Sequence, residues 1–126
     1  MINIILVDDH KLFRMTLKMA LSESPDFCIL GETDSSTVLF AMLKAAPCDL
    51  VLLDINMPEM DGIEIARRLR REYPAVKVLV ISHENTKETV SALLEIGIEG
   101  FISKQMGEVE EITRAIYSIS EGYEYY

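Results

Sequence analysis

Two adjacent carboxylates, Asp8 and Asp9, follow directly on an apolar run at the start of the chain, INIILV (Ile2–Val7). Negative charges this close repel each other, and the repulsion raises the pKa of the carboxyl groups. The pair is therefore either a solvated turn or a site to which a positive charge must come. The pair by itself leaves both interpretations open.

Three other polar residues stand at the ends of apolar runs: Asp54 after LVLL, Ser82 after VKVLVI and Lys104 after GFIS. If Asp54 joins the acidic pair, the three carboxylates need a cation, and oxygen ligands suit Mg²⁺. Lys104 offers a compact positive charge for a phosphate, and the hydroxyl of Ser82 can bond to the same group. This set suits phosphoryl transfer, in which a carboxylate can also be the covalent acceptor.

The order of apolar and amphipathic stretches predicts that these strand ends meet. We expect strands over Ile2–Val7, Phe27–Leu30, Leu50–Leu53, Val76–Ile81 and Gly100–Ser103. We expect helices over Lys11–Glu23, Gly62–Tyr73 and Lys87–Ile96, the last ending at Gly97. A further helix should start at Ser35 or Ser36, with Val38, Leu39, Met42 and Leu43 facing inward. The last helix should have Val109, Ile112, Ile116 and Ile119 facing inward. Such alternation predicts an α/β fold with a parallel sheet covered on both faces. In these sheets ligands bind outside the carboxyl ends of the strands, so the polar ends converge on one edge.

The bulk properties narrow the class of protein. The 126 residues fit one domain, 1–126, and the net charge of −9 argues against direct nucleic-acid binding and against an anionic membrane surface. The apolar runs are too short to span a bilayer, and the start of the chain shows no signal peptide, so a cytoplasmic location is expected. Cys28 and Cys48 are expected to be reduced thiols rather than a disulfide or a metal site, and His10 is expected to be a loop residue rather than a ligand.

Four motifs carry a resemblance to a known family: VDDH (Val7–His10), LLDINMPEMDG (Leu52–Gly62), VISHE (Val80–Glu84) and GFISK (Gly100–Lys104). Together they resemble the receiver domain of bacterial two-component response regulators. The resemblance covers the whole chain. It implies a single flavodoxin-like, doubly wound domain, with a five-stranded parallel sheet in the order 2-1-3-4-5 and five helices.

The resemblance also implies roles for the residues at the strand ends. Asp54 would accept a phosphoryl group from a sensor histidine kinase. Asp8 and Asp9 would hold Mg²⁺ together with Asp54 and the backbone carbonyl of Asn56. In this reading the acidic pair binds a cation that lets a phosphoryl group approach Asp54.

Ser82 and Lys104 would contact the phosphoryl oxygens in such a domain. Phe101 matches the aromatic switch residue, which turns inward when Ser82 moves toward the phosphate. The surface around Phe101 and the fourth helix would then change to control an output domain or a partner protein. No enzymatic activity is expected beyond self-phosphorylation and autodephosphorylation.

The first segment, VDDHKLFR, and the last helix are similar to the subgroup whose receiver precedes a LuxR/NarL-type helix-turn-helix output domain. The chain is therefore interpreted as the input domain of a transcription regulator, with a phosphorylation-dependent homodimer as one possible form. The alternative is a stand-alone receiver or adaptor with no DNA-binding output.

A degenerate receiver used only for binding is disfavoured because the acidic pair, Asp54 and Lys104 are all present. A haloacid dehalogenase-like phosphatase is disfavoured because that family carries DxD where this chain has DDH.

Some positions depart from the family pattern or vary within it. Gln105 stands where many receivers have a proline preceded by a cis bond, and His83 could narrow access to Asp54. Asn56 and Glu84 flank the expected path of an attacking water, and the same pair occurs in the fast-cycling chemotaxis receiver. We therefore predict that phosphate is lost quickly, with Asn56 and Glu84 setting the rate.

Two further stretches have plain structural interpretations. The basic run Arg67–Arg71 is expected to form i,i+4 pairs on a solvated helix face, Glu64 with Arg68 and Arg68 with Glu72. The tyrosines near the chain end, Tyr123, Tyr125 and Tyr126, are expected to begin a linker rather than to form a packing surface.

Overall fold

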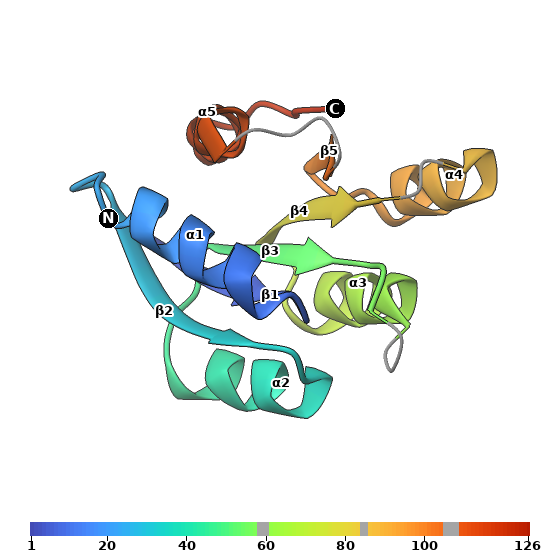
Figure 1. The fold of residues 1–126 in the computed structure, drawn as a ribbon. Coiled ribbons are helices and arrows are strands. Elements are labelled where there is room, and N and C mark those ends of the chain that lie inside the picture. Colours follow the sequence, from blue (N-terminus) through green and yellow to red (C-terminus); the bar gives the residue numbers. More distant parts are fainter. Residues whose placement is uncertain (58–60, 84–85, 105–108) are drawn as a thin grey trace.

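A parallel sheet forms the centre of the molecule (Figure 1). The computed structural model describes residues 1–57, 61–83, 86–104 and 109–126. Within them the strands are β1 (Ile2–Val7), β2 (Phe27–Thr33), β3 (Leu50–Asp54), β4 (Lys77–Ser82) and β5 (Gly100–Ser103). The helices are α1 (Lys11–Leu21), α2 (Ser36–Ala45), α3 (Gly62–Glu72), α4 (Lys87–Ile96) and α5 (Val109–Ser120). The strand order β2-β1-β3-β4-β5 confirms the predicted topology.

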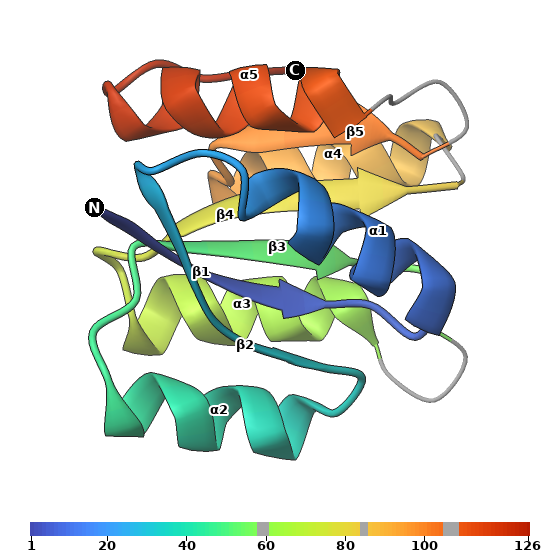
Figure 2. The same ribbon diagram turned by 60° about the vertical axis from the view of Figure 1, so that its left-hand side comes forward.

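Two apolar layers hold the helices to the sheet. Side chains alternate between the faces of a strand, so Ile4 and Leu6 of β1 join the core under α1 and α5, whereas Ile5 and Val7 join the core under α2, α3 and α4. Figure 2 shows these two groups of helices on opposite faces of the sheet. Burial on both faces explains why the central strands are continuous apolar runs.

Polar caps set the helix ends that approach the strand ends. The Ser35 hydroxyl accepts a hydrogen bond from the Val38 amide at 3.3 Å, as one of the two predicted caps of α2. Asp61 caps α3, and Thr86 caps α4. Gly97 ends α4 with a φ of 84°, as the sequence predicted. Each cap is worth about 1 kcal/mol and fixes where its helix starts relative to the sheet.

The structure differs from the sequence prediction mainly on the edge strand β2. This strand continues to Thr33 instead of ending at Leu30, because Gly31 and Glu32 pair with Ile5 and Leu6 of β1. An edge strand can carry such polar residues, so the apolar pattern marked only its first half. Val38, predicted to point inward, is 45% exposed, and Phe40 takes its place in the core.

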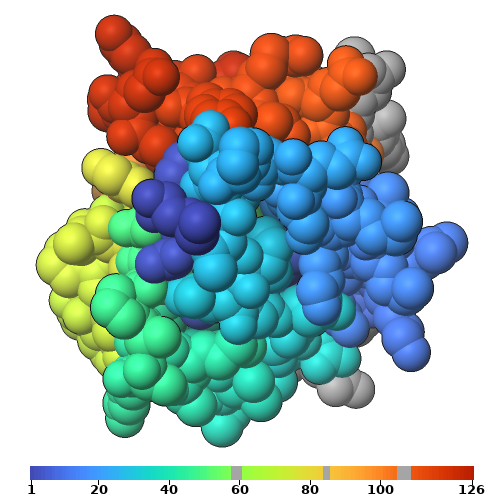
Figure 3. Space-filling model, turned by 90° about the vertical axis from the view of Figure 1, so that its left-hand side faces the viewer, coloured from blue at the N-terminus to red at the C-terminus, as the bar shows by residue number. Residues whose placement is uncertain are grey.

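The two ends of the sheet differ in chemistry. Figure 3 shows the end where the strands begin, with the N-terminus, the segment before β2 and the end of α5 side by side. There the Ile2 amide donates to the Asp26 carbonyl at 2.7 Å, and the Tyr117 hydroxyl lies 2.6 Å from that of Ser24. Cys28 and Cys48 are free thiols, as predicted, and burial raises the pKa of Cys48 to about 11. The residues predicted to do chemistry lie at the opposite end.

Candidate functional site at the carboxyl ends of the strands

The polar residues that follow the strands meet at one edge of the sheet, as predicted. The Lys104 ammonium nitrogen lies 2.8 Å from Asp8 Oδ2 and 3.3 Å from Asp54 Oδ2. Ligand atoms of Asp8, Asp9, His10 and Asp54 all lie within 4.8 Å of one another. The structure therefore joins the ends of β1, β3 and β5 in one charged cluster.

Backbone contacts fix the acidic pair at the end of β1. The Asp8 amide donates to the Thr33 carbonyl at 3.0 Å, which continues the pairing of β1 with β2. Asp8 Oδ1 then accepts a hydrogen bond from the His10 amide at 2.7 Å and closes the turn into α1. Arg14 of α1 donates to the Asp8 carbonyl oxygen. Asp8 is only 4% exposed, so its carboxylate is held in place before any ligand arrives.

Asp54 is the most buried carboxylate of the cluster. It occupies the last position of β3, and its side chain is fully buried. Burial raises the pKa of the Asp54 carboxyl group, and the charge of Asp8 raises it further. The Asn56 amide, which donates to Asp54 Oδ1 at 2.8 Å, and the Lys104 ammonium act in the opposite direction. The ionised form of Asp54 is therefore held under electrostatic strain.

Ser82 joins the site through Asn56. Its hydroxyl donates to Asn56 Oδ1 at 2.8 Å, and the His83 amide donates to the same oxygen at 2.7 Å. Asn56 thus ties the loop after β3 to the end of β4. The sequence predicts a role for Asn56 beside the water path, but this contact depends on the orientation of a side chain and leaves no sequence signal.

The donor set fits a hard divalent cation. Its carboxylates come from three aspartates, and carboxylate oxygens are what such ions prefer. Asp9 Oδ1 is buried and accepts no hydrogen bond from the residues that the structure describes, although His10 Nδ1 lies 3.3 Å away. A buried carboxylate oxygen without a donor is costly, and a bound cation would satisfy it.

Residues that sequence analysis did not assign to the site also surround Lys104. Its ammonium nitrogen lies 2.8 Å from His10 Nδ1 and 4.4 Å from the centre of the Phe13 ring. The His10 ring stands edge-on to His83, with ring centres 5.5 Å apart. His10 precedes α1 as a loop residue, as expected, and its ring also reaches the cluster. A lone histidine and a helix phenylalanine carry no sequence signal for such a contact.

Phe101, the expected switch residue, lies on β5 and is half-buried against the core shared by α2, α3 and α4. It lines an apolar hollow of about 220 Å³, whose other described lining residues are Val90, Leu93, Leu94, Ile98 and Tyr126. Glu84 and Gln105 lie outside the described residues, so the structure does not place these two predicted positions.

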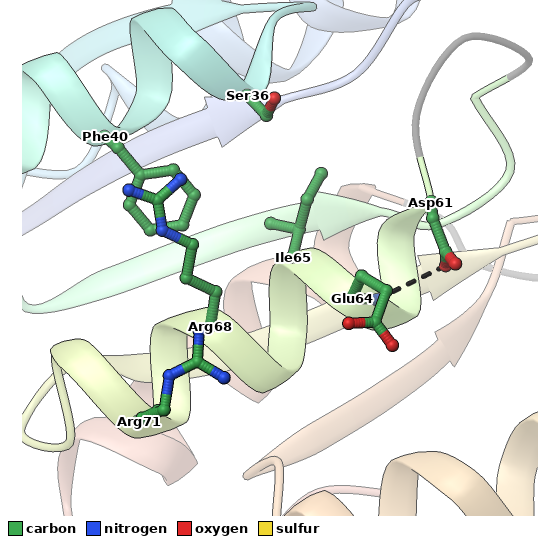
Figure 4. A pocket seen from close by; sticks show the side chains of 7 residues that line it. All are labelled: Ser36, Phe40, Asp61, Glu64, Ile65, Arg68 and Arg71. Atoms are coloured by element: carbon green, nitrogen blue, oxygen red, sulfur yellow. Dashed lines mark hydrogen bonds between the residues drawn. The ribbon is translucent and has the colours of Figure 1, made fainter.

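A second hollow, of about 350 Å³, lies between α2 and α3 (Figure 4). In it the Arg68 guanidinium lies 3.7 Å from the centre of the Phe40 ring. Arg68 pairs with Glu72 at 2.8 Å, as predicted, but Glu64 pairs with Arg67 rather than Arg68. The prediction for Glu64 was wrong because Arg68 turns toward α2 instead. None of the described residues that line this hollow belongs to the acidic cluster.

Each helix in the described ranges is too short or too polar to cross a lipid bilayer.

Comparisons with known proteins agree with this geometry. The family model described as the response regulator receiver domain matches residues 4–117. The transcriptional regulatory protein DegU of Brevibacillus brevis is 32% identical over 121 residues, which are 96% of this chain and 51% of DegU. The nitrate/nitrite response regulator protein NarL of Escherichia coli is 33% identical over 119 residues, which are 94% of this chain and 55% of NarL.

Solved structures show the same architecture. The isolated REC domain of RcsB from Salmonella enterica serovar Typhimurium, in the presence of phosphomimetic BeF3−, matches with a TM-score of 0.89 at 26% identity. The match covers 98% of this chain and 91% of that one. The chain spans about half the length of the curated relatives it matches. It belongs to the response regulator receiver domain family, and its relatives are response regulators of the LuxR/NarL kind.

Proposed function

We propose that this domain is a signalling switch that accepts a phosphoryl group on Asp54 from a sensor histidine kinase. The observation that carries the proposal is the position of Lys104, whose buried ammonium lies between the carboxylates of Asp8 and Asp54. This arrangement puts a nucleophilic carboxylate next to a fixed positive charge. The family match supports a phosphoacceptor in general, and the assignment to Asp54 is our proposal.

The transfer would proceed by attack of an Asp54 carboxylate oxygen on the phosphorus of a phosphohistidine. The new phosphorus–oxygen bond forms as the phosphorus–nitrogen bond breaks, and the electron pair of the broken bond stays on that nitrogen. A ring that carries a proton on its other nitrogen then leaves as neutral imidazole. Such reactions depend on positioning and charge neutralisation. Lys104 would neutralise one phosphoryl oxygen, and the Ser82 hydroxyl would turn from Asn56 to donate to another.

Asp8, Asp9 and Asp54, with the backbone carbonyl of Asn56, would hold Mg²⁺, which supplies charge neutralisation for the incoming phosphoryl group. The unsatisfied Asp9 oxygen supports a cation in this pocket. Magnesium is the assignment that the family supports, because receiver domains generally bind it at an acidic pocket.

The output would follow from the surface around Phe101 and α4. Movement of Ser82 toward the phosphate would let Phe101 turn inward and change that surface. Because two relatives that are nearly twice as long are named as transcriptional regulators, we propose that this domain is the cytoplasmic input domain of such a regulator. A stand-alone receiver that acts on a partner protein, or on a second copy of itself, is the second candidate.

The first experiment treats the purified domain with acetyl phosphate and Mg²⁺ and measures its intact mass. We expect one phosphoryl group on the wild type and none on Asp54→Asn, which keeps the shape but removes the nucleophile. A full adduct on Asp54→Asn would refute the assignment of the acceptor. Sustained hydrolysis of small phosphate esters by the wild type would instead favour the phosphatase alternative. It would contradict an activity limited to self-phosphorylation and autodephosphorylation.

A further inference from the structure

The segment after α5 folds back onto the open edge of β5. A turn at Gly122, with a φ of 98°, reverses the chain. The Tyr125 amide then donates to the Glu99 carbonyl at 3.0 Å, and the Tyr125 carbonyl accepts from the Phe101 amide at 2.8 Å. Tyr125 and Gly100 form a parallel bridge, so this segment continues the sheet beyond β5. Figure 1 shows the end of the chain beside β5.

Gly100 makes this close approach possible. A Cβ atom at this position would lie 3.0 Å from the Tyr125 carbonyl oxygen and 2.7 and 2.8 Å from side-chain carbons of Leu79 and Ile119. The backbone oxygen cannot move away without losing its hydrogen bond to Phe101. The edge of β5 is therefore shaped to receive the Tyr125 backbone.

Tyr126 extends this contact to the surface around Phe101. Its ring lines the same apolar hollow as Phe101. Its hydroxyl donates to the Ile98 carbonyl at 2.7 Å and lies beside the Glu124 carboxylate. Tyr126 is 58% exposed, so its ring borders the hollow from outside rather than filling a core position. Burial, with the neighbouring Glu124 carboxylate, raises the pKa of Tyr126 to about 12, so its hydroxyl stays a donor at neutral pH.

One short strand connects this covered hollow to the charged cluster. Phe101 lies on β5, which leads directly into Lys104, and the Lys104 amide donates to the Ser82 carbonyl at 2.8 Å. The Phe101 side chain thus lines the hollow that Tyr126 borders, and the Phe101 amide is hydrogen-bonded to Tyr125. A rotation of the Phe101 ring toward the core would remove this side of the hollow.

We propose that Tyr126 anchors the segment after α5 on the surface formed by α4 and β5, and that phosphorylation of Asp54 loosens this anchor through Phe101. This inference rests on the proposed function, because it requires Phe101 to respond to the phosphoryl group. Coupling of two equilibria is reciprocal. If phosphorylation weakens the docking of Tyr126, removal of the Tyr126 ring must favour the phosphorylated conformation.

The first test uses the absence of tryptophan from the chain. Tyr126→Trp introduces a single indole, and acrylamide quenching reports its accessibility with and without Mg²⁺ and beryllium fluoride as a phosphoryl mimic. We expect quenching of this indole to increase when the mimic binds. Tyr123→Trp is the matched control, because Tyr123 is similarly exposed but does not line the hollow beside Phe101, so its indole should be quenched equally in both states. Unchanged quenching of Trp at position 126 on binding of the mimic would overturn the proposal.

The second test measures the reciprocal effect by calorimetric titration of beryllium fluoride in the presence of Mg²⁺. Tyr126→Ala should bind the mimic several-fold more tightly than the wild type, toward the lower end of the roughly 5–150-fold range of allosteric coupling. Tyr126→Phe, which keeps the ring but loses the hydroxyl contact with Ile98, should lie between Tyr126→Ala and the wild type, and Tyr123→Ala should bind like the wild type. Equal affinities in all four proteins would overturn the coupling while leaving the phosphoacceptor function intact. Failure of the wild type to bind the mimic would overturn the proposed function and, with it, the coupling.

Discussion

The ammonium of Lys104 and the carboxylate of Asp8 form a hydrogen-bonded ion pair at 2.8 Å between residues 96 positions apart in the sequence. Both side chains are only 5% exposed. The pair therefore connects the turn after the first strand to the end of the last one. Because Lys104 also contacts Asp54, it is the counterion of the cluster in the absence of a bound cation.

Loss of Lys104 should destabilise the domain. Lys104→Met leaves two buried carboxylates without their counterion, and breaking a buried ion pair in this way typically costs about 3–5 kcal/mol. We expect the free energy of unfolding in EDTA to fall by an amount of this order. Mg²⁺ should recover part of the loss, so the magnesium-dependent rise in melting temperature should exceed that of the wild type. Lys44→Met, at an exposed position, is the control. Equal magnesium responses in Lys104→Met and the wild type would contradict this role.

Magnesium should stabilise the wild type through the acidic pair. A ligand that binds only the folded state adds RT ln(1 + [L]/Kd), which is about 1.4 kcal/mol at roughly ten times Kd. Asp9→Ala removes the unsatisfied carboxylate oxygen and should abolish most of this gain while leaving the fold intact. Thermal unfolding with and without Mg²⁺, checked by circular dichroism, measures both effects. A magnesium-dependent shift of wild-type size in Asp9→Ala would rule out the proposed cation site.

Asp54 should limit stability at neutral pH. The pKa of its carboxyl group is raised above the ordinary value of 3.8, chiefly by burial. The folded state therefore holds the proton more tightly than the unfolded state, and stability is lost as the pH rises from that ordinary value through the raised one. Asp54→Asn removes this loss. It should raise the melting temperature at pH 7 to 8, and the gain should disappear below about pH 4.

The exposed Asp34 provides a matched control for this charge change, because Asp34→Asn should leave the melting temperature nearly unchanged. A lower melting temperature for Asp54→Asn at neutral pH would show that the contacts of the carboxylate with Asn56 and Lys104 outweigh its burial. That result would reverse our view of the cluster as strained.

The sequence predicted the parts of the site that depend on topology. Apolar runs of strand length that alternate with helices leave few arrangements, and in a parallel sheet the ends of the runs must share an edge. Asp8, Asp54 and Lys104 could therefore be brought together from pattern alone. The hydrogen bonds that Asn56 accepts from Ser82 and His83 could not be predicted, because they depend on a side-chain rotamer in a loop.

The docking of the last residues was missed for a different reason. The sequence EGYEYY has neither strand alternation nor helical periodicity, and a single bridge between Tyr125 and Gly100 leaves no repeating signal. The last residues dock there because the edge of β5 is open and because Gly100 is small enough to let their backbone approach. Neither condition can be recognised before the sheet is assembled. The interpretation of the tyrosines as the start of a linker therefore needs correction, since Tyr125 and Tyr126 pack on the domain.

The lifetime of the phosphorylated state should depend on Asn56. An acyl phosphate is lost when water attacks in line, opposite the Asp54 oxygen, and Asn56, two residues after Asp54, is predicted to flank this path. Asn56→Arg adds bulk there and should slow phosphate release several-fold, on the order of 1 kcal/mol in the barrier. The same expectation holds for Glu84→Tyr on sequence grounds alone, because Glu84 lies outside the described residues.

The structure adds a competing explanation that the experiment must separate. Asn56 Oδ1 accepts hydrogen bonds from Ser82 and the His83 amide, so any substitution also releases the end of β4. Asn56→Ala removes the acceptor without adding bulk and therefore isolates this effect. If obstruction of water governs the lifetime, Asn56→Arg slows the release of phosphate from purified phosphorylated protein, whereas Asn56→Ala does not. If both variants slow release equally, the contact with Ser82 sets the rate, and if both decay like the wild type, Asn56 has no kinetic role.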